Sequence, residues 1–164
     1  MPNSKNSSWF GKNTYAFVDL EIMLPKTIAL EISDSSGDLS ISHVATLSLE
    51  DSSGDLEIAH VSGDLTVDDS SGGIDIEHVL GSVSVSDSSG GIDISDVGKD
   101  VLIRADSSGD IYIKNVKAGV HIKRDSSGSI YVKDIGGDFR VDRDGSGGIT
   151  HKNIGGKVEL PTED

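Results

Sequence analysis

The tetrapeptide Asp-Ser-Ser-Gly recurs along the chain at a spacing that hardly changes. Six copies are followed by one variant, Asp-Gly-Ser-Gly, and successive Asp residues lie 17 to 19 residues apart. A nearly constant period of this length indicates a repeat architecture, in which each unit stacks on the next. The seven Asp residues, called the corner aspartates below, are Asp34, Asp51, Asp69, Asp87, Asp106, Asp125 and Asp144.

Each unit between two tetrapeptides contains the same apolar pattern. An apolar–x–apolar pair follows the Gly, an isolated aliphatic residue comes next, and a second apolar–x–apolar pair precedes the next Asp. In one unit these residues are Leu56 and Ile58, then Val61, then Leu65 and Val67. Alternation with a period of two is typical of a strand with one buried face. Each unit therefore predicts two short strands, which bury their apolar faces only when units stack.

We therefore predict an all-β, single-domain parallel β-helix (β-solenoid) with about seven coils of 17–19 residues and two short strands per coil. The coil should be right-handed, because crossovers between parallel strands almost always are. Residues 17–161 should form the solenoid, residues 1–16 an N-terminal extension that caps it, and residues 162–164 a C-terminal tail. An alternating strand that ends at Pro25 should open the solenoid. The apolar residues of this strand are Val18, Leu20, Ile22 and Leu24.

The two corners of each coil have different turn chemistry. At the tetrapeptide, Asp is expected to accept backbone N–H bonds, Gly to supply a positive φ angle, and one Ser of each pair to face inward, where stacked hydroxyls bond along the axis. The other corner always carries His, Asp or Asn, which tolerate left-handed backbone geometry. The residues at this second corner are His43, His60, His78, Asp96, Asn115, Asp134 and Asn153.

Charge is unevenly distributed along the chain, whose net charge is −14. Between Glu31 and Asp100 there are 16 acidic residues and one basic residue, whereas 101–164 holds 10 of each. An acidic surface repels nucleic acid, which we exclude as a partner. No apolar run reaches the roughly 20 residues of a membrane span. The chain has no Cys, which excludes disulfides and thiolate metal sites.

The repeat resembles a bacterial family of β-strand-repeat proteins designated DUF4097 and described as adhesin-like. The resemblance covers about 17–161 and includes the final segments Gly145-Ser146-Gly147-Gly148-Ile149 and Gly156-Lys157-Val158-Glu159-Leu160-Pro161. It implies an exported or envelope-associated bacterial protein, and it implies no catalytic residues. Because residues 1–16 lack the apolar core of a signal peptide, we leave the compartment open and expect the cell envelope if such a peptide has been removed.

Two aromatic and two basic residues form the candidate ligand surface. Tyr112 and Tyr131 should stack on neighbouring coils and face outward, with Lys114 and Lys133 two residues further along each strand. Such a strip could stack on a sugar or bind an anionic polymer. The alternative is that good strand formers pair across the sheet without binding anything.

Two further columns raise the question of metal binding. His43, His60 and His78 should stack on adjacent coils, where imidazoles could hold Zn²⁺ or Cu²⁺, but turn preference explains the same residues. The corner aspartates could hold Ca²⁺ between coils, yet the nine-residue repeat of calcium-binding β-rolls is missing. We therefore expect no cofactor and keep a Ca²⁺-stabilised β-roll as an alternative.

No pattern in the chain is typical of catalysis. Neither a Ser-His-Asp arrangement nor HExxH nor a phosphate-binding Gly-rich loop before a helix is present. We predict a non-enzymatic structural or adhesin-like solenoid that presents an acidic lateral surface to a protein or a glycan. A carbohydrate-active enzyme on a β-helix scaffold is the alternative. The protein should be a monomer or a weak end-to-end or lateral oligomer.

Overall fold

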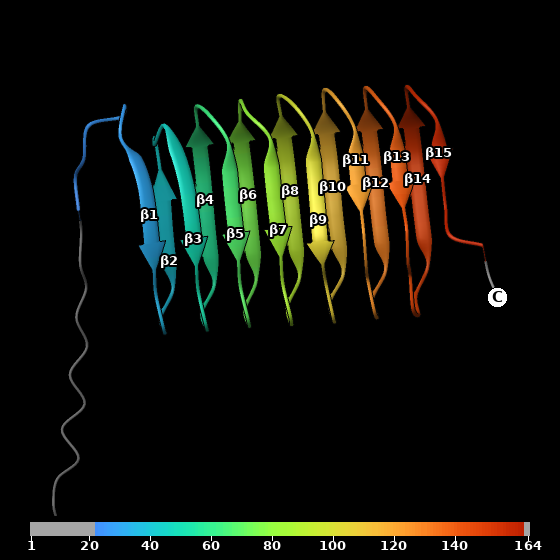
Figure 1. Ribbon diagram of the computed structural model, residues 1–164, viewed down its shortest axis with the longest axis horizontal. Coiled ribbons are helices and arrows are strands. Elements are labelled where there is room, and N and C mark those ends of the chain that lie inside the picture. Colours follow the sequence, from blue (N-terminus) through green and yellow to red (C-terminus); the bar gives the residue numbers. More distant parts are fainter. Residues whose placement is uncertain (1–21, 163–164) are drawn as a thin grey trace, which may run out of the picture.

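The computed structural model describes residues 22–162, and every regular element in this range is a β-strand. Figure 1 shows the strands in two layers that form a straight rod, with the chain advancing along the long axis. The strands are β1 Ala29–Ser33, β2 Leu39–Ser42, β3 Thr46–Glu50, β4 Leu56–Val61, β5 Leu65–Asp68, β6 Ile74–Val79, β7 Val83–Ser86, β8 Ile92–Val97, β9 Val101–Ala105, β10 Ile111–Val116, β11 Val120–Ile122, β12 Ile130–Ile135, β13 Phe139–Val141, β14 Ile149–Ile154 and β15 Val158–Glu159.

The odd-numbered and even-numbered strands form two separate parallel sheets. Sheet A has eight strands in the order β1-β3-β5-β7-β9-β11-β13-β15, and sheet B has seven, from β2 to β14. Equivalent residues of successive coils are paired, for example Leu39 with Leu56 and Leu56 with Ile74. The chain therefore alternates between the sheets, and the predicted parallel β-solenoid with two strands per coil is confirmed.

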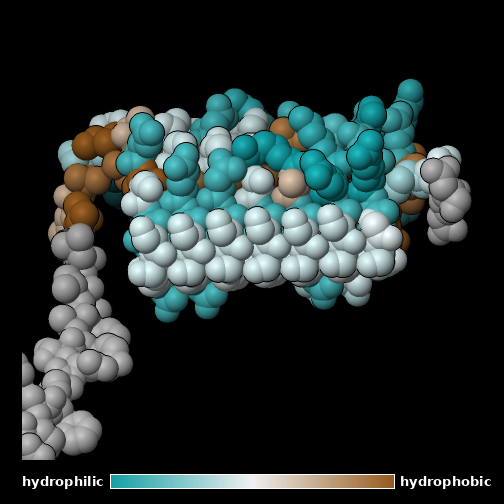
Figure 2. Space-filling model, turned by 60° about the horizontal axis from the view of Figure 1, so that its bottom comes forward, coloured by the Kyte–Doolittle hydropathy of each residue, from teal (hydrophilic) through white to brown (hydrophobic). Residues whose placement is uncertain are grey.

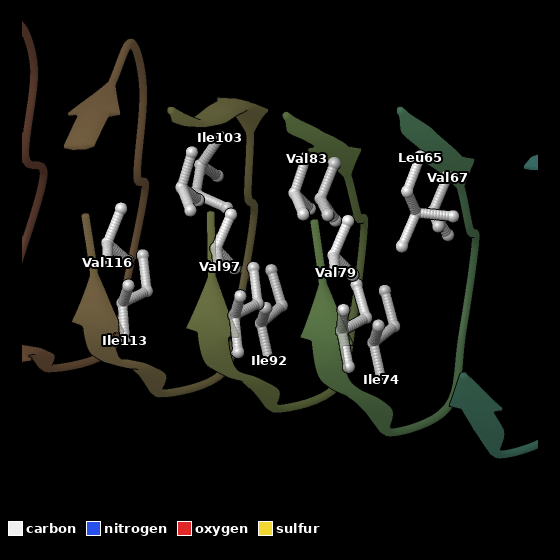
Figure 3. Packing of buried hydrophobic residues seen from close by; sticks show 14 of the residues in the cluster. Leu65, Val67, Ile74, Val79, Val83, Ile92, Val97, Ile103, Ile113 and Val116 are labelled. Atoms are coloured by element: carbon white, nitrogen blue, oxygen red, sulfur yellow. The ribbon is translucent and has the colours of Figure 1, made fainter. Parts of the chain in front are cut away.

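The core lies between the two sheets and consists of the predicted aliphatic columns. Ile74 and Ile92 point inward from sheet B and Leu65 and Val83 from sheet A, as Figure 3 shows, and all are almost completely buried. The isolated aliphatic residue of each coil, such as Val97, closes the core at the second corner. Because inward and outward residues alternate, each coil buries its apolar side chains against the coils on either side.

The second corner has left-handed backbone geometry in every coil. Its seven residues, from His43 to Asn153, all have φ between 55° and 60°. Asn and Asp adopt this geometry more readily than other non-Gly residues, and His shares that tendency. The residue types of this corner are therefore explained by backbone conformation alone, as the sequence predicted.

The N-terminal end of the solenoid differs from the prediction. Ile22 and Leu24 are exposed and belong to no strand, so the expected opening strand is wrong for these residues, and the first strand within 22–162 begins at Ala29. Val18 and Leu20, and the N-terminal cap expected over 1–16, lie outside the described residues. The range 22–162 contains no helix able to cross a membrane.

The last coil closes with a thinner core. His151 is paired with Val132, at a position that is aliphatic in earlier coils, and its ring lies 5.9 Å from that of Phe139. Val158 and Leu160 remain partly exposed. Because no described coil follows, this end of the core has packing partners on one side only.

Candidate functional site

Five of the seven corner aspartates are buried in the core, which the sequence pattern was not expected to give, and the two at the ends, Asp34 and Asp144, are half-buried. In the first four units the Asp follows the last inward aliphatic residue by two positions, as Asp87 follows Val85, so the period of two places it on the buried face. Later units insert one more residue, and the register between β7 and β9 shifts at this point. Asp106 is 0% exposed and Asp125 is 1% exposed. The expectation that a Ser faces inward is wrong. The alternation of inward and outward residues along the strand is the signal that could have identified the Asp as the inward residue.

Only one oxygen of most buried carboxyl groups is hydrogen bonded. Oδ1 of Asp106 accepts a hydrogen bond from the backbone N–H of Ser108 at 3.1 Å, and Asp125 and Ser127 repeat this contact one coil later. The predicted Asx-type turn is therefore present. Oδ2 has no hydrogen-bond partner among the described residues in Asp69, Asp87, Asp106 and Asp125. The result is a column of buried, half-satisfied carboxyl groups.

Burial changes the acidity of this column. Burial, together with the neighbouring carboxylates of Asp125 and Asp87, raises the pKa of Asp106 to about 7. Burial likewise raises the pKa of Asp87 to about 6 and that of Asp125 to about 6, against hydrogen bonds from Ser N–H groups that lower both. A carboxyl group without water or a cation beside it favours its neutral form. Part of the column therefore carries protons near neutral pH.

The Ser side chains of the tetrapeptides lie on the outside of the same corner. The hydroxyl of Ser53 donates to the carbonyl of Ser35, and that of Ser127 donates to the carbonyl of Ser107, both across one coil. Figure 2 shows a flat, pale band along the rod, the hydropathy expected for Ser and Gly. Stacked hydroxyls do bond along the axis, as expected, but on the surface.

The three His residues stack as predicted. The ring centroids of His43 and His60 are 4.7 Å apart, and those of His60 and His78 are 5.0 Å apart. Nε2 of His78 also lies 3.6 Å from a carboxylate oxygen of Asp96 on the next coil. Within 22–162, however, no group of three or more His, Asp or Glu residues is arranged to hold a metal ion. Stacked imidazoles at a left-handed corner therefore need no metal to explain them.

The residues of the candidate ligand surface lie on the outer face of sheet B. Tyr112 and Tyr131 stack with centroids 4.7 Å apart and an interplanar angle of 4°, and they are 43% and 38% exposed. Lys114 and Lys133 are paired on the same two strands. The tyrosine row is Ser40, Glu57, Asp75, Asp93, Tyr112, Tyr131 and Thr150, and the lysine row is Ser42, Ala59, Glu77, Ser95, Lys114, Lys133 and Lys152.

A shallow hollow of about 810 Å³ lies on this face, beside the tyrosine pair. Gly73 and Gly91 line it without side chains, and Asp75, Asp93 and Tyr112 are also among its lining residues. Burial raises the pKa of Asp75, and the nearby carboxylate of Asp93 raises it further. The hollow is open to solvent and acidic, so it favours cationic or hydrogen-bond-donating groups.

The outer face of sheet A, in contrast, has charges that already pair with one another. Nε2 of His121 lies 2.9 Å from Asp142, and Nε of Arg140 donates to the same carboxylate at 2.6 Å. These two contacts, with the Arg140 bond the larger cause, hold the pKa of Asp142 below its ordinary value. In the lysine row of sheet B, Lys133 lies 3.4 Å from Asp134, whereas Lys114 and Lys152 form no ion pair with any described residue. The amino groups of Lys114 and Lys152 on sheet B are therefore available to a partner.

The stacked coils and repeated corners define the class of the protein: it is a parallel β-solenoid repeat protein. A family model described as Toastrack, DUF4097, matches residues 2–159, and the chain belongs to this family. The resemblance seen in the sequence is thereby confirmed. No curated protein and no solved structure matches the chain.

Proposed function

We propose that this solenoid is a non-enzymatic, adhesin-like scaffold that binds a protein or a glycan on the outer face of sheet B. The observation that carries the proposal is the exposed, parallel Tyr112–Tyr131 stack, which lies beside Lys114 and Lys133 on a flat face. Preordered aromatic rings supply contact area with little loss of side-chain entropy, and Tyr hydroxyls add hydrogen bonds.

The positions of the acidic groups support a role in binding over a role in catalysis. The strongly shifted carboxyl groups of Asp87, Asp106 and Asp125 are sealed in the core, where no substrate reaches them. Asp75 and Asp93 are accessible but lie in an open hollow. Water exclusion and fixed positioning, on which catalytic carboxyl groups depend, are not provided by such a surface. Turnover of a polysaccharide by the purified chain, lost in Asp75→Asn, would favour the carbohydrate-active alternative.

The test of the binding face is a glycan array probed with the wild-type chain and with Tyr112→Ala/Tyr131→Ala. We expect the wild type to bind a defined glycan class and the double variant to lose about tenfold in affinity, because stacking of a sugar on two aromatic rings contributes ~1.4 kcal/mol in total. His43→Asn/His60→Asn, which removes a stacked pair at the second corner and keeps residues that tolerate its left-handed backbone, is the matched control. Equal binding by the two double variants would exclude the tyrosine pair as the site.

We further propose that the corner aspartates need no Ca²⁺. The Oδ1 atoms of Asp69, Asp87, Asp106 and Asp125 accept Ser N–H groups. Burial favours protonation of these carboxyl groups over ion binding. The thermal midpoint of unfolding should be the same in calcium and in a chelator at equal ionic strength. A rise in the midpoint that is specific to calcium, and that disappears in Asp106→Asn, would support the Ca²⁺-stabilised alternative instead.

A further inference from the structure

The outer face of sheet B has opposite character in its two halves. On the N-terminal side, the tyrosine row presents the carboxylates of Glu57, Asp75 and Asp93, and the lysine row presents Glu77. On the C-terminal side, the same rows present the stacked tyrosines and the amino groups of the three lysines. The acidic half holds the hollow, whereas the tyrosines of the other half are exposed beside it. One face therefore contains two surfaces that complement each other.

We propose that this face binds a second copy of the chain in an antiparallel pair, related by a two-fold axis that is parallel to the strands and lies between β8 and β10. This inference rests on the proposed function, in which the outer face of sheet B binds a partner, and it identifies that partner as a second copy of the chain. A rotation about this axis reverses the order of the coils and keeps each row opposite itself. The acidic half of one copy then lies against the tyrosine and lysine half of the other, twice.

The proposed axis brings complementary groups together in both rows. Counting coils outward from the axis, Tyr131 lies opposite Asp75 of the second copy, so its phenol hydroxyl meets a carboxylate acceptor. Tyr112 lies opposite Asp93 of the second copy, and its hydroxyl would exchange its 3.3 Å bond to Asp110 of the same chain for this acceptor. In the lysine row, Lys133 lies opposite Glu77 of the second copy. Because the arrangement is two-fold, each of these pairs occurs twice.

The shapes of the two halves also complement each other. The hollow lies where Gly73 and Gly91 lack side chains, on the coils of β6 and β8. The same rotation places these coils opposite those of β12 and β10, which carry Tyr131 and Tyr112. The two exposed rings of one copy therefore lie over the hollow of the other.

Other two-fold arrangements of this face bring like charges together. A two-fold axis along the length of the rod keeps the order of the coils, so the acidic half of one copy meets the acidic half of the other. When this axis runs between the tyrosine row and the lysine row, Asp75 lies opposite Glu77 of the second copy. An axis parallel to the strands and through β8 places the two Asp93 side chains on each other, and one through β10 does the same to Lys114. Like charges in direct contact oppose association, so the axis between β8 and β10 is selected by charge as well as by shape.

The size of the face sets the expected strength of the pair. Six coils overlap, and at about 4.8 Å between strands and about 3.3 Å per residue along strands of six residues, the pair buries roughly 1,100 Å² in total. Interfaces of this size are weak and reversible, and charged ones weaken further with salt. The pair should therefore form at high protein concentration and low ionic strength.

The test is a charge swap followed by sedimentation equilibrium. Lys133→Glu places two carboxylates opposite each other, and Glu77→Lys places two amino groups opposite each other, so each single variant should weaken the dimer at least about tenfold. The double variant Lys133→Glu/Glu77→Lys restores both pairs and should return to within about threefold of wild-type affinity. Lys123→Glu, which changes net charge as Lys133→Glu does but lies outside sheet B, should leave the dimer unchanged.

Several outcomes would overturn the pairing: a wild-type chain that stays monomeric at low salt, single reversals without effect, or a double variant that is no stronger than the single ones. The proposed function is tested separately by the glycan array. A monomer that binds a glycan through Tyr112 and Tyr131 overturns the pairing and leaves the proposed function standing. A pair that responds to the charge swap, with an empty array, supports the pairing and removes the glycan from the proposed function.

Discussion

Gly109→Ala should destabilise the solenoid by at least ~4 kcal/mol, or prevent its folding. Gly109 has a φ of +135°, which residues with a Cβ resist. A Cβ added there would also overlap the carbonyl oxygen of Gly90 on the preceding coil. The backbones of these two coils lie so close at this corner that neither coil can move without breaking the hydrogen bonds between them. The measurement is urea unfolding followed by circular dichroism.

Two other glycines distinguish the two causes of this destabilisation, which are backbone strain and overlap of the added Cβ with the neighbouring coil. Gly37 has a φ of +114° but no atom within 4 Å of an added Cβ, so Gly37→Ala should show backbone strain alone, about 1–2 kcal/mol. Gly91 has no positive φ, and its added Cβ would lie 3.7 Å from the nearest atom, so Gly91→Ala should change stability by less than ~0.5 kcal/mol. If all three variants unfolded at the same urea concentration, close stacking of the corner glycines would be disproved.

The second large effect concerns pH, and it is opposite in sign to ordinary acid denaturation. Burial raises the pKa of Asp106 from 3.8 to about 7 in the folded state. The folded protein therefore binds more protons than the unfolded chain between these pH values, and its stability falls as pH rises through this window. Below about pH 3.8 both states are protonated and the stabilisation is complete. Above about pH 7 the folded protein bears the cost of a buried charge.

Asp106→Asn should remove this cost. The variant should match the wild type near pH 4 and exceed it at pH 8 by roughly 3 kcal/mol, because a buried amide replaces a buried carboxylate beside Asp87 and Asp125. Glu50→Gln, which neutralises an exposed acid, controls for the decrease in net negative charge. Urea midpoints measured from about pH 4 to pH 8 would test this. A pH profile unchanged by Asp106→Asn would show that the column does not titrate in this range.

Much of the solenoid could be predicted because its determinants are local and repeated. Coil length, strand positions and register follow from the spacing of the corner aspartates and from the alternation of residues such as Leu56 and Ile58. The same period predicted the stack of Tyr112 on Tyr131. The repeat pattern was a poorer guide at the N-terminal end: the alternation before Pro25 predicted a strand, but among the described residues Ile22 and Leu24 pack against no coil and lie exposed.

The orientation of the polar residues depended on the tertiary structure. Turn propensity describes what Asp and Ser can bond to, but which of them faces inward depends on where two sheets close on each other. That closure buried Asp106 and left the Ser hydroxyls outside. The sequence by itself determined a stack of coils with two strands each, because the regularly repeated apolar side chains are removed from water only when the coils stack. Only the tertiary structure decided that the stack encloses a column of carboxyl groups and that acidic and aromatic halves share one face, because both depend on contacts between coils.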